Sequence, residues 1–151
     1  MRIYLPATLD DLAPTSPGLT PRRVHAVTAA LRAALPDEDE EGLEFAAQLL
    51  AADDSLDLLA RAPAAPRLRV VVSADVPDAV VEPVEDPGAA PSVVVLTTGV
   101  GRDEIACAHV DEPAARADVV AALAGDVDAI ERLGDADLLW YDASELRSIP
   151  R

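Results

Sequence analysis

The stretch that decides the fold spans residues 67–110, RLRVVVSADVPDAVVEPVEDPGAAPSVVVLTTGVGRDEIACAHV. Three apolar segments rich in β-branched residues, at 67–76, 92–98 and 105–110, have the composition of strands, and 79–84 is a weaker candidate. Proline and glycine turns separate these segments, and no helical pattern lies between them. Because strands follow one another directly, the sequence argues against a regular doubly wound α/β fold.

The segment before this stretch predicts one strand and two helices. RIYLPAT at 2–8 alternates as a strand does, and Pro6 should make that strand short or place it at a sheet edge. A threonine followed by a proline, and apolar residues at helical spacing, predict a first helix over 20–35. A second amphipathic helix is predicted over about 41–61.

The segment after the stretch predicts two more helices and a last strand. Helices are expected near 113–125 and 126–134, a strand at 138–141, and a final helical turn from Ser144. The predicted fold is therefore a single α+β domain over 1–151, with two layers. Its sheet is expected to be mixed, with about five strands, and the helices are expected largely on one face.

The net charge of the chain argues against two classes of partner. The sequence has 28 acidic and 12 basic residues, for a formal net charge of −16. Nucleic acids and anionic membranes are bound largely by neutralising their negative charge, so we expect neither as a partner. A protein partner, a homodimer, a metal cation and a small molecule stay open.

Residue usage bears on origin and compartment. Every basic residue is arginine, and the chain lacks lysine and asparagine, which indicates a very GC-rich genome. The single cysteine, Cys107, allows no internal disulfide, and the sequence shows no signal peptide and no apolar run of membrane length. We therefore expect a cytoplasmic protein.

One predicted strand places a thiol, an imidazole and a carboxylate on the same face. Cys107, His109 and Asp111 alternate along it, and their side chains are of the kinds that bind zinc. Donors spaced by two residues on one strand lie about 6–7 Å apart, so at most two of them could reach one metal ion. We expect no functional metal here, but a buried thiol beside a histidine near the surface.

Two further sets of residues are weak binding candidates. His25, Thr28 and Arg32 would lie along one flank of the predicted first helix and could hold an anion. Trp140 and Tyr141 are adjacent in the last strand, so alternation should bury one and expose the other. We expect Trp140 in the core, which leaves Tyr141 as the candidate for contact with a partner.

The sequence resembles a known group of proteins over nearly its whole length. The segments that carry the resemblance are MRIYLPAT (1–8), AVTAALR (26–32), EGLEFAA (41–47), VVVSADV (70–76), AHVD (108–111) and LLWY (138–141). In this order they resemble a family of small uncharacterised proteins, a domain of unknown function, from GC-rich actinobacteria. The resemblance implies such an origin and one domain, and it implies no catalytic or binding residues.

Two functions stay open at this point. The first is a non-enzymatic binding or regulatory module, favoured because the chain has no nucleotide-binding, hydrolase or zinc-protease motif and we expect no cofactor. The alternative is a small enzyme or ligand-binding protein that uses carboxylates or the face of Cys107, His109 and Asp111. A flat apolar patch or a symmetric dimer contact would favour the first function. A deep pocket lined by polar groups would favour the alternative.

Overall fold

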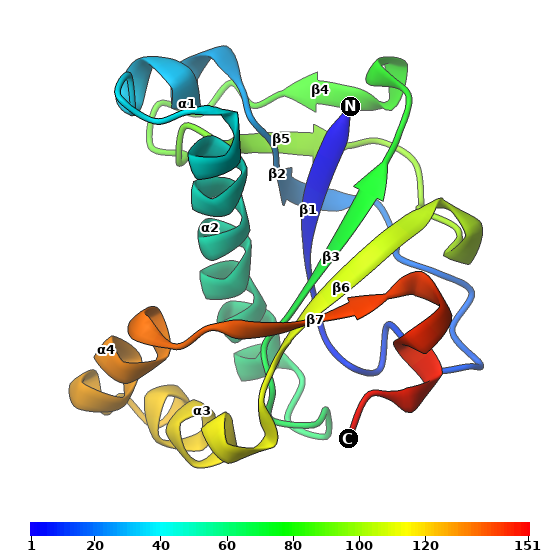
Figure 1. Cartoon of the computed structure of the whole chain (residues 1–151), viewed down its shortest axis with the longest axis vertical. Helices are drawn as coiled ribbons and strands as arrows, with labels where there is room; N and C mark the ends of the chain where they lie inside the picture. The colour runs from blue at the N-terminus through cyan, green and yellow to red at the C-terminus, as the bar shows by residue number, and fades with distance from the viewer.

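The computed structural model describes residues 1–151 and is built around one seven-stranded sheet (Figure 1). The strand order is β4-β5-β2-β1-β3-β6-β7, and every neighbouring pair is antiparallel. The strands are β1 (Arg2–Ala7), β2 (Arg22–His25), β3 (Val70–Asp75), β4 (Val81–Pro83), β5 (Val93–Leu96), β6 (Ile105–Asp111) and β7 (Leu138–Asp142). The α+β character is as expected, whereas the expected mixed sheet of about five strands is corrected to seven antiparallel ones.

Four α-helices and four short 3₁₀ segments complete the chain. The α-helices are α1 (Ala29–Ala34), α2 (Glu40–Arg61), α3 (Arg116–Leu123) and α4 (Val127–Asp135). The 3₁₀ segments are η1 (Asp78–Val80), η2 (Arg102–Glu104), η3 (Pro113–Ala115) and η4 (Ala143–Ser148). The long helix α2 begins where Asp39 Oδ1 accepts a hydrogen bond from the Gly42 N–H at 2.9 Å, which is an N-cap. No helix is both long enough and apolar enough to cross a membrane.

The predicted first helix over 20–35 is wrong for its first half. Residues 22–25 form β2, which lies between β5 and β1, and the helix α1 starts only after Thr28. Val24 pairs with Val94 of β5 and is fully buried. Its apolar side chain fits a strand as well as a helix, and hydrogen bonding of this segment to two neighbouring strands favours the strand.

Pro6 does not place β1 at the edge of the sheet. This strand lies between β2 and β3, and all six of its residues pair with β3. The Pro6 carbonyl accepts a hydrogen bond from the Arg22 guanidinium at 3.0 Å, so the polar side of its backbone faces β2. Only Tyr4 and His25 are paired between β1 and β2, and a missing N–H at Pro6 therefore removes no ladder hydrogen bond.

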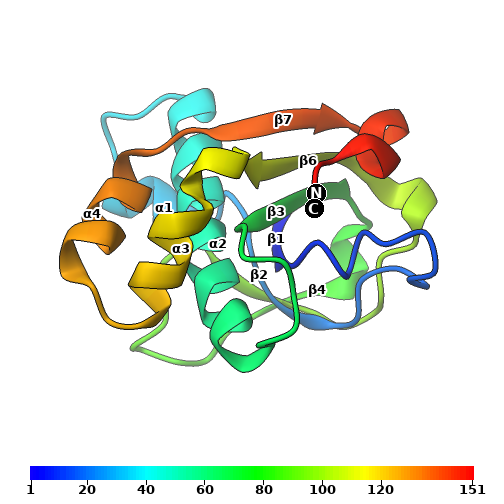
Figure 2. The same cartoon turned by 90° about the horizontal axis from the view of Figure 1, so that it is seen from below.

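The two faces of the sheet are covered in different ways. The larger core cluster, which includes Leu5, Val72 and Val110, is covered by apolar residues of the irregular segment 8–21 and by Leu146 of η4. The other face packs through Tyr4 and Val71 of the sheet against small residues of α2, namely Ala47, Ala51 and Ala52. Figure 2 shows the four α-helices together on one side and the C-terminal segment on the other.

Candidate functional site

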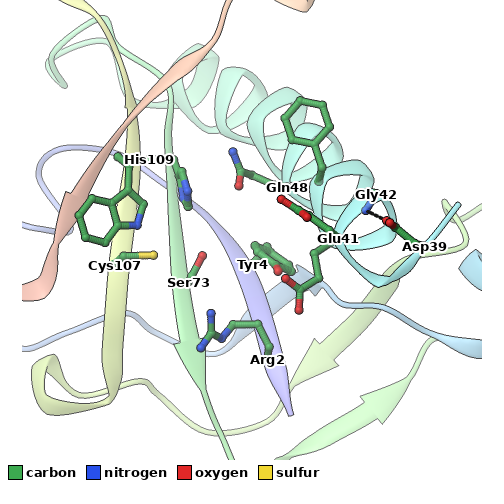
Figure 3. Close-up of a pocket in the computed structure, with 12 residues that line it drawn as sticks. Arg2, Tyr4, Asp39, Glu41, Gly42, Gln48, Ser73, Cys107 and His109 are labelled. Atoms are coloured by element: carbon green, nitrogen blue, oxygen red, sulfur yellow. Dashed lines mark hydrogen bonds between the residues drawn. The ribbon is translucent and has the colours of Figure 1, made fainter.

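A pocket of about 580 Å³ lies where the first half of α2 faces the sheet. Strands β1, β3, β6 and β7 contribute Arg2, Tyr4, Ser73, Cys107, His109 and Trp140. The helix and its N-cap contribute Asp39, Glu41, Gly42, Glu44, Phe45 and Gln48. Figure 3 shows Ser73, Cys107 and His109 projecting from the strands toward the helix residues Glu41 and Gln48.

A β-bulge lies directly before Cys107 at the edge of this pocket. Ser73 pairs with Cys107 and Ala74 pairs with Ile105, so β6 has one extra residue, Ala106, opposite β3. Ile105 therefore packs into the large core cluster on one face, whereas Cys107, two residues later, lines the pocket on the other face. Bulges are frequent next to functional sites because they redirect side chains in this way.

Two buried polar atoms on the sheet have no hydrogen-bond partner, and both belong to residues of the pocket. They are Ser73 Oγ and His109 Nδ1. Ser73 is only 1% exposed, and a buried polar group without a partner destabilises a fold by about 1–3 kcal/mol. Burial also lowers the pKa of His109, so its imidazole is neutral at pH 7. The floor of the pocket thus presents a hydroxyl and a neutral imidazole.

The charged groups of the pocket are unevenly compensated. The Arg2 guanidinium donates two hydrogen bonds of 2.7 Å to the carboxylate of Asp75, which neutralises its charge. The carboxylates of Glu41 and Glu44 have no ion pair within the chain, and Glu44 interacts by a hydrogen bond with the phenol of Tyr4. Burial, followed by the proximity of Glu44, raises the pKa of Tyr4 well above its usual value, so its phenol stays protonated and can donate.

His25 belongs to a separate, buried chain of hydrogen bonds. Its Nε2 lies 3.0 Å from Asp54 Oδ2, and its Nδ1 lies 2.7 Å from the hydroxyl of Ser92. Serine, histidine and aspartate are joined in the order seen in serine hydrolases. In this chain Ser92 is 0% exposed, so no substrate reaches its hydroxyl. The three residues instead connect β2, α2 and the turn before β5.

The other two residues of the proposed anion site are paired elsewhere. Thr28 caps α1 by accepting a hydrogen bond from Leu31 N–H at 3.0 Å, and its hydroxyl donates to the Pro91 carbonyl. Arg32 forms an exposed ion pair with Glu40 at 2.6 Å. Because β2 replaces the first half of the predicted helix, His25 shares no helix flank with Thr28 and Arg32.

The three residues predicted to share one face of a strand, Cys107, His109 and Asp111, do not all line the pocket. Cys107 and His109 both line the pocket. Asp111 is fully buried beyond it and accepts hydrogen bonds from the backbone and guanidinium of Arg69 at 2.8–3.2 Å. No group of three His, Cys, Asp or Glu residues is arranged to hold a metal ion.

The roles expected for the two adjacent aromatic residues are exchanged. Trp140 is 59% exposed, so its predicted place in the core is wrong, and it lines the pocket instead. Tyr141 is half-buried and packs against the large core cluster. Trp140 points to the same face of the sheet as α2, but strand β7 is at the sheet edge, and the side chain remains mostly exposed.

Sequence reasoning missed most of the pocket. Arg2, Ser73 and Glu44 were not among its candidates, because one sequence does not show which strands become neighbours. One signal was present, since Ser73 is the only hydroxyl residue in the apolar segment VVVSADV. A polar residue inside a strand buried on both faces needs a partner, and such a residue is a candidate for function.

The fold and the pocket together define an α+β protein with a polar, partly aromatic pocket between a long helix and an antiparallel sheet. Residues 1–149 match the model of a protein family described as a family of unknown function, DUF6912, and the chain belongs to this family. No curated protein and no solved structure matches the chain significantly.

Proposed function

We propose that this protein is a binding module for a small molecule, which it holds in the pocket between α2 and the sheet. Of the two functions left open by the sequence, this is the ligand-binding form of the alternative. A pocket of about 580 Å³ is within the range of small-molecule sites. Its lining is mostly polar and combines three aromatic side chains, Tyr4, Phe45 and Trp140, with polar groups such as Ser73 and His109.

The observation that carries the proposal is the hydroxyl of Ser73. It is buried, faces the pocket and has no partner within the chain. A serine kept for stability would hydrogen-bond to the protein, as Ser55 does with the carbonyl of Ala7 at 2.7 Å. A ligand with a donor or acceptor at this point would satisfy Ser73, and could satisfy His109 Nδ1 in the same way.

Covalent catalysis by Cys107 is a second candidate function, which the position of Cys107 and His109 in the pocket favours. A nucleophilic cysteine works with a base within hydrogen-bond reach. Cys107 is buried, and no hydrogen bond joins its thiol to His109. Binding without catalysis therefore fits this arrangement better.

The test uses the only tryptophan of the chain as a reporter, because Trp140 lines the pocket. A library of small molecules with positive, neutral and negative members is screened by thermal stabilisation, and the hits are titrated by Trp140 fluorescence. A ligand at 100 times its dissociation constant stabilises the fold by about 2.7 kcal/mol. We expect at least one compound to produce both signals.

The decisive variant is Ser73→Ala, with Ser148→Ala as its control. Ser148 is exposed and has no side-chain hydrogen bond. Ser73→Ala should weaken the hit about tenfold and should not lower the free energy of unfolding of the free protein, because no intramolecular hydrogen bond is lost and an unpartnered buried hydroxyl is removed. Unchanged binding together with a large loss of stability would show a structural serine and refute the proposal.

We further propose a cytoplasmic location and an origin in a GC-rich actinobacterium. The support is the composition: one cysteine, and arginine as the only basic residue type. A homodimer or a protein partner is compatible with ligand binding, and sedimentation of the free and ligand-bound protein would test for a dimer.

A further inference from the structure

We propose that the ligand of this pocket is a small organic cation, with an amine or guanidinium group carried on an apolar or planar body. This inference rests on the proposed binding function and adds the chemical class of the ligand. It is carried by three features of the pocket: unpaired carboxylates, two aromatic side chains, and a buried hydroxyl without a partner.

The unpaired carboxylates favour a positive charge. Glu41 and Glu44 lie one turn apart at the start of α2 and line the same pocket, and neither has a cationic partner in the chain. Glu44 is half-buried, so its charge is weakly screened by solvent. Other carboxylates that are wholly or partly buried, such as Asp11, Asp111 and Asp118, have an arginine beside them. An amine or guanidinium on the ligand would fill the same role for Glu44.

The aromatic side chains favour an organic cation. Trp140 from β7 and Phe45 from α2 both line the pocket and are more than half exposed, at 59% and 52%. The faces of aromatic side chains attract organic cations, and these two are accessible to a ligand. Two exposed aromatic groups beside two carboxylates that lack a cationic partner are a combination suited to a cation with an apolar body.

An anionic ligand fits this pocket poorly. The positive charge of Arg2 is compensated by Asp75 through two hydrogen bonds of 2.7 Å. The N-terminus of α2 is capped by the carboxylate of Asp39, and Glu40 and Glu41 occupy its first turn. An anion would meet these carboxylates without a free cation to hold it.

The buried hydroxyl shows that the carboxylates belong to a formed site. Ser73 Oγ lies on the sheet side of the pocket, opposite the helix that carries Glu41 and Glu44, and is buried without a partner. A ligand with its cation at the helix would place its body across the pocket toward Ser73 and the neutral imidazole of His109. The hydroxyl and the imidazole then hydrogen-bond to uncharged polar groups of that body.

The experiment compares three probes that share a benzoyl group and an amide and differ in one side chain. Nα-benzoyl-L-argininamide carries a guanidinium, the matching citrulline amide carries a neutral urea of the same shape, and the matching glutamate amide carries a carboxylate. Each is titrated into the intact protein at low salt and followed by Trp140 fluorescence. We expect the arginine probe to bind at least tenfold more tightly than the other two, and its affinity to fall when sodium chloride is raised from 50 to 500 mM.

The matched variants are Glu44→Gln and Glu41→Gln, with Glu131→Gln as the control. Glu131 is an exposed residue of α4 outside the pocket, so its variant changes the net charge equally. Glu44→Gln should weaken the arginine probe about tenfold and leave the citrulline probe unchanged, and Glu131→Gln should change neither.

Three outcomes would overturn the inference. In the first, the arginine and citrulline probes bind with equal affinity. In the second, the glutamate probe binds most tightly or none of the probes binds. In the third, Glu44→Gln and Glu131→Gln change the affinity equally. The library screen with Ser73→Ala judges the proposed binding function separately. A neutral or anionic ligand that depends on Ser73 would refute the cationic class and still support the pocket as a binding site.

Discussion

Removal of Asp111 should strongly destabilise the fold, because it would leave a buried arginine unpaired. The side chains of Arg69 and Asp111 are 4% and 0% exposed, and the backbone N–H, Nε and Nη2 of Arg69 all donate to the carboxylate. Loss of one partner of such a pair costs about 3–5 kcal/mol. For a chain of this size, that lowers the melting temperature by roughly 6–20 °C.

The assay is a double-mutant cycle in urea, with Asp111→Leu, Arg69→Met and the combination Arg69→Met/Asp111→Leu, and Asp111→Ala is measured beside it. The combination removes both charges and fills the space, so it should lose only about 1–2 kcal/mol, mainly from the unpaired backbone N–H of residue 69. Additive effects, or a loss below about 1 kcal/mol for Asp111→Ala, would refute this reasoning. In that case Asp111 would be available for a role beside Cys107 and His109.

Four further outcomes are expected. Trp140→Ala should lower the free energy of unfolding by less than about 1 kcal/mol in urea, far less than a core aromatic residue would, because its side chain is mostly exposed. Gly18→Ala should destabilise the fold by more than about 1 kcal/mol in thermal denaturation, because the φ of Gly18 is +123° and a Cβ would lie 2.3 Å from the Val100 carbonyl oxygen. Gly134→Ala should stabilise the fold slightly, because Gly134 is in α4 and a Cβ there meets open space. Burial lowers the pKa of His109 below 6.5, so as the pH falls the unfolded chain takes up a proton at this residue before the folded chain does. The free energy of unfolding should therefore fall as the pH drops below about 6.5. His109→Gln should reduce that loss, measured by urea titrations at pH 7 and 5. A DNA titration at low salt should show no micromolar affinity, given the net charge of −16.

The sequence predicted those elements whose pattern is local. Helix α2 and strands β3, β5 and β6 lie within a few residues of their predicted bounds, because their composition and turns are unambiguous. Strand β2 was missed because four residues cannot distinguish a strand from a helix turn, and β5, the strand with which all four pair, lies far along the chain. Helix content and the α+β class could therefore be predicted, and strand order could not.

The same distinction explains what was found of the candidate site. Cys107 and His109 were grouped because alternation along one strand is a local property. The exposure of Trp140 depends on how α2 covers β7, which the sequence does not show. Glu41 and Glu44 could be singled out only once the ion pairs of the chain were known. A pocket formed between elements distant in sequence cannot be recognised from a single chain in advance.

The place of β1 within the sheet also affects how the protein folds as it is synthesised. Ile3 pairs with Ala74, so β1 cannot meet its main neighbour until about 70 more residues have been made. The ribosome adds about 5–20 residues per second, so this delay is roughly 4–14 s. During this time the apolar strand β1 has not paired with β3. The earliest β partner that the ribosome can release for it is β2, which offers a single residue pair. The apolar side chains of β1 therefore cannot be covered by their main partner strand until β3 has emerged from the ribosome.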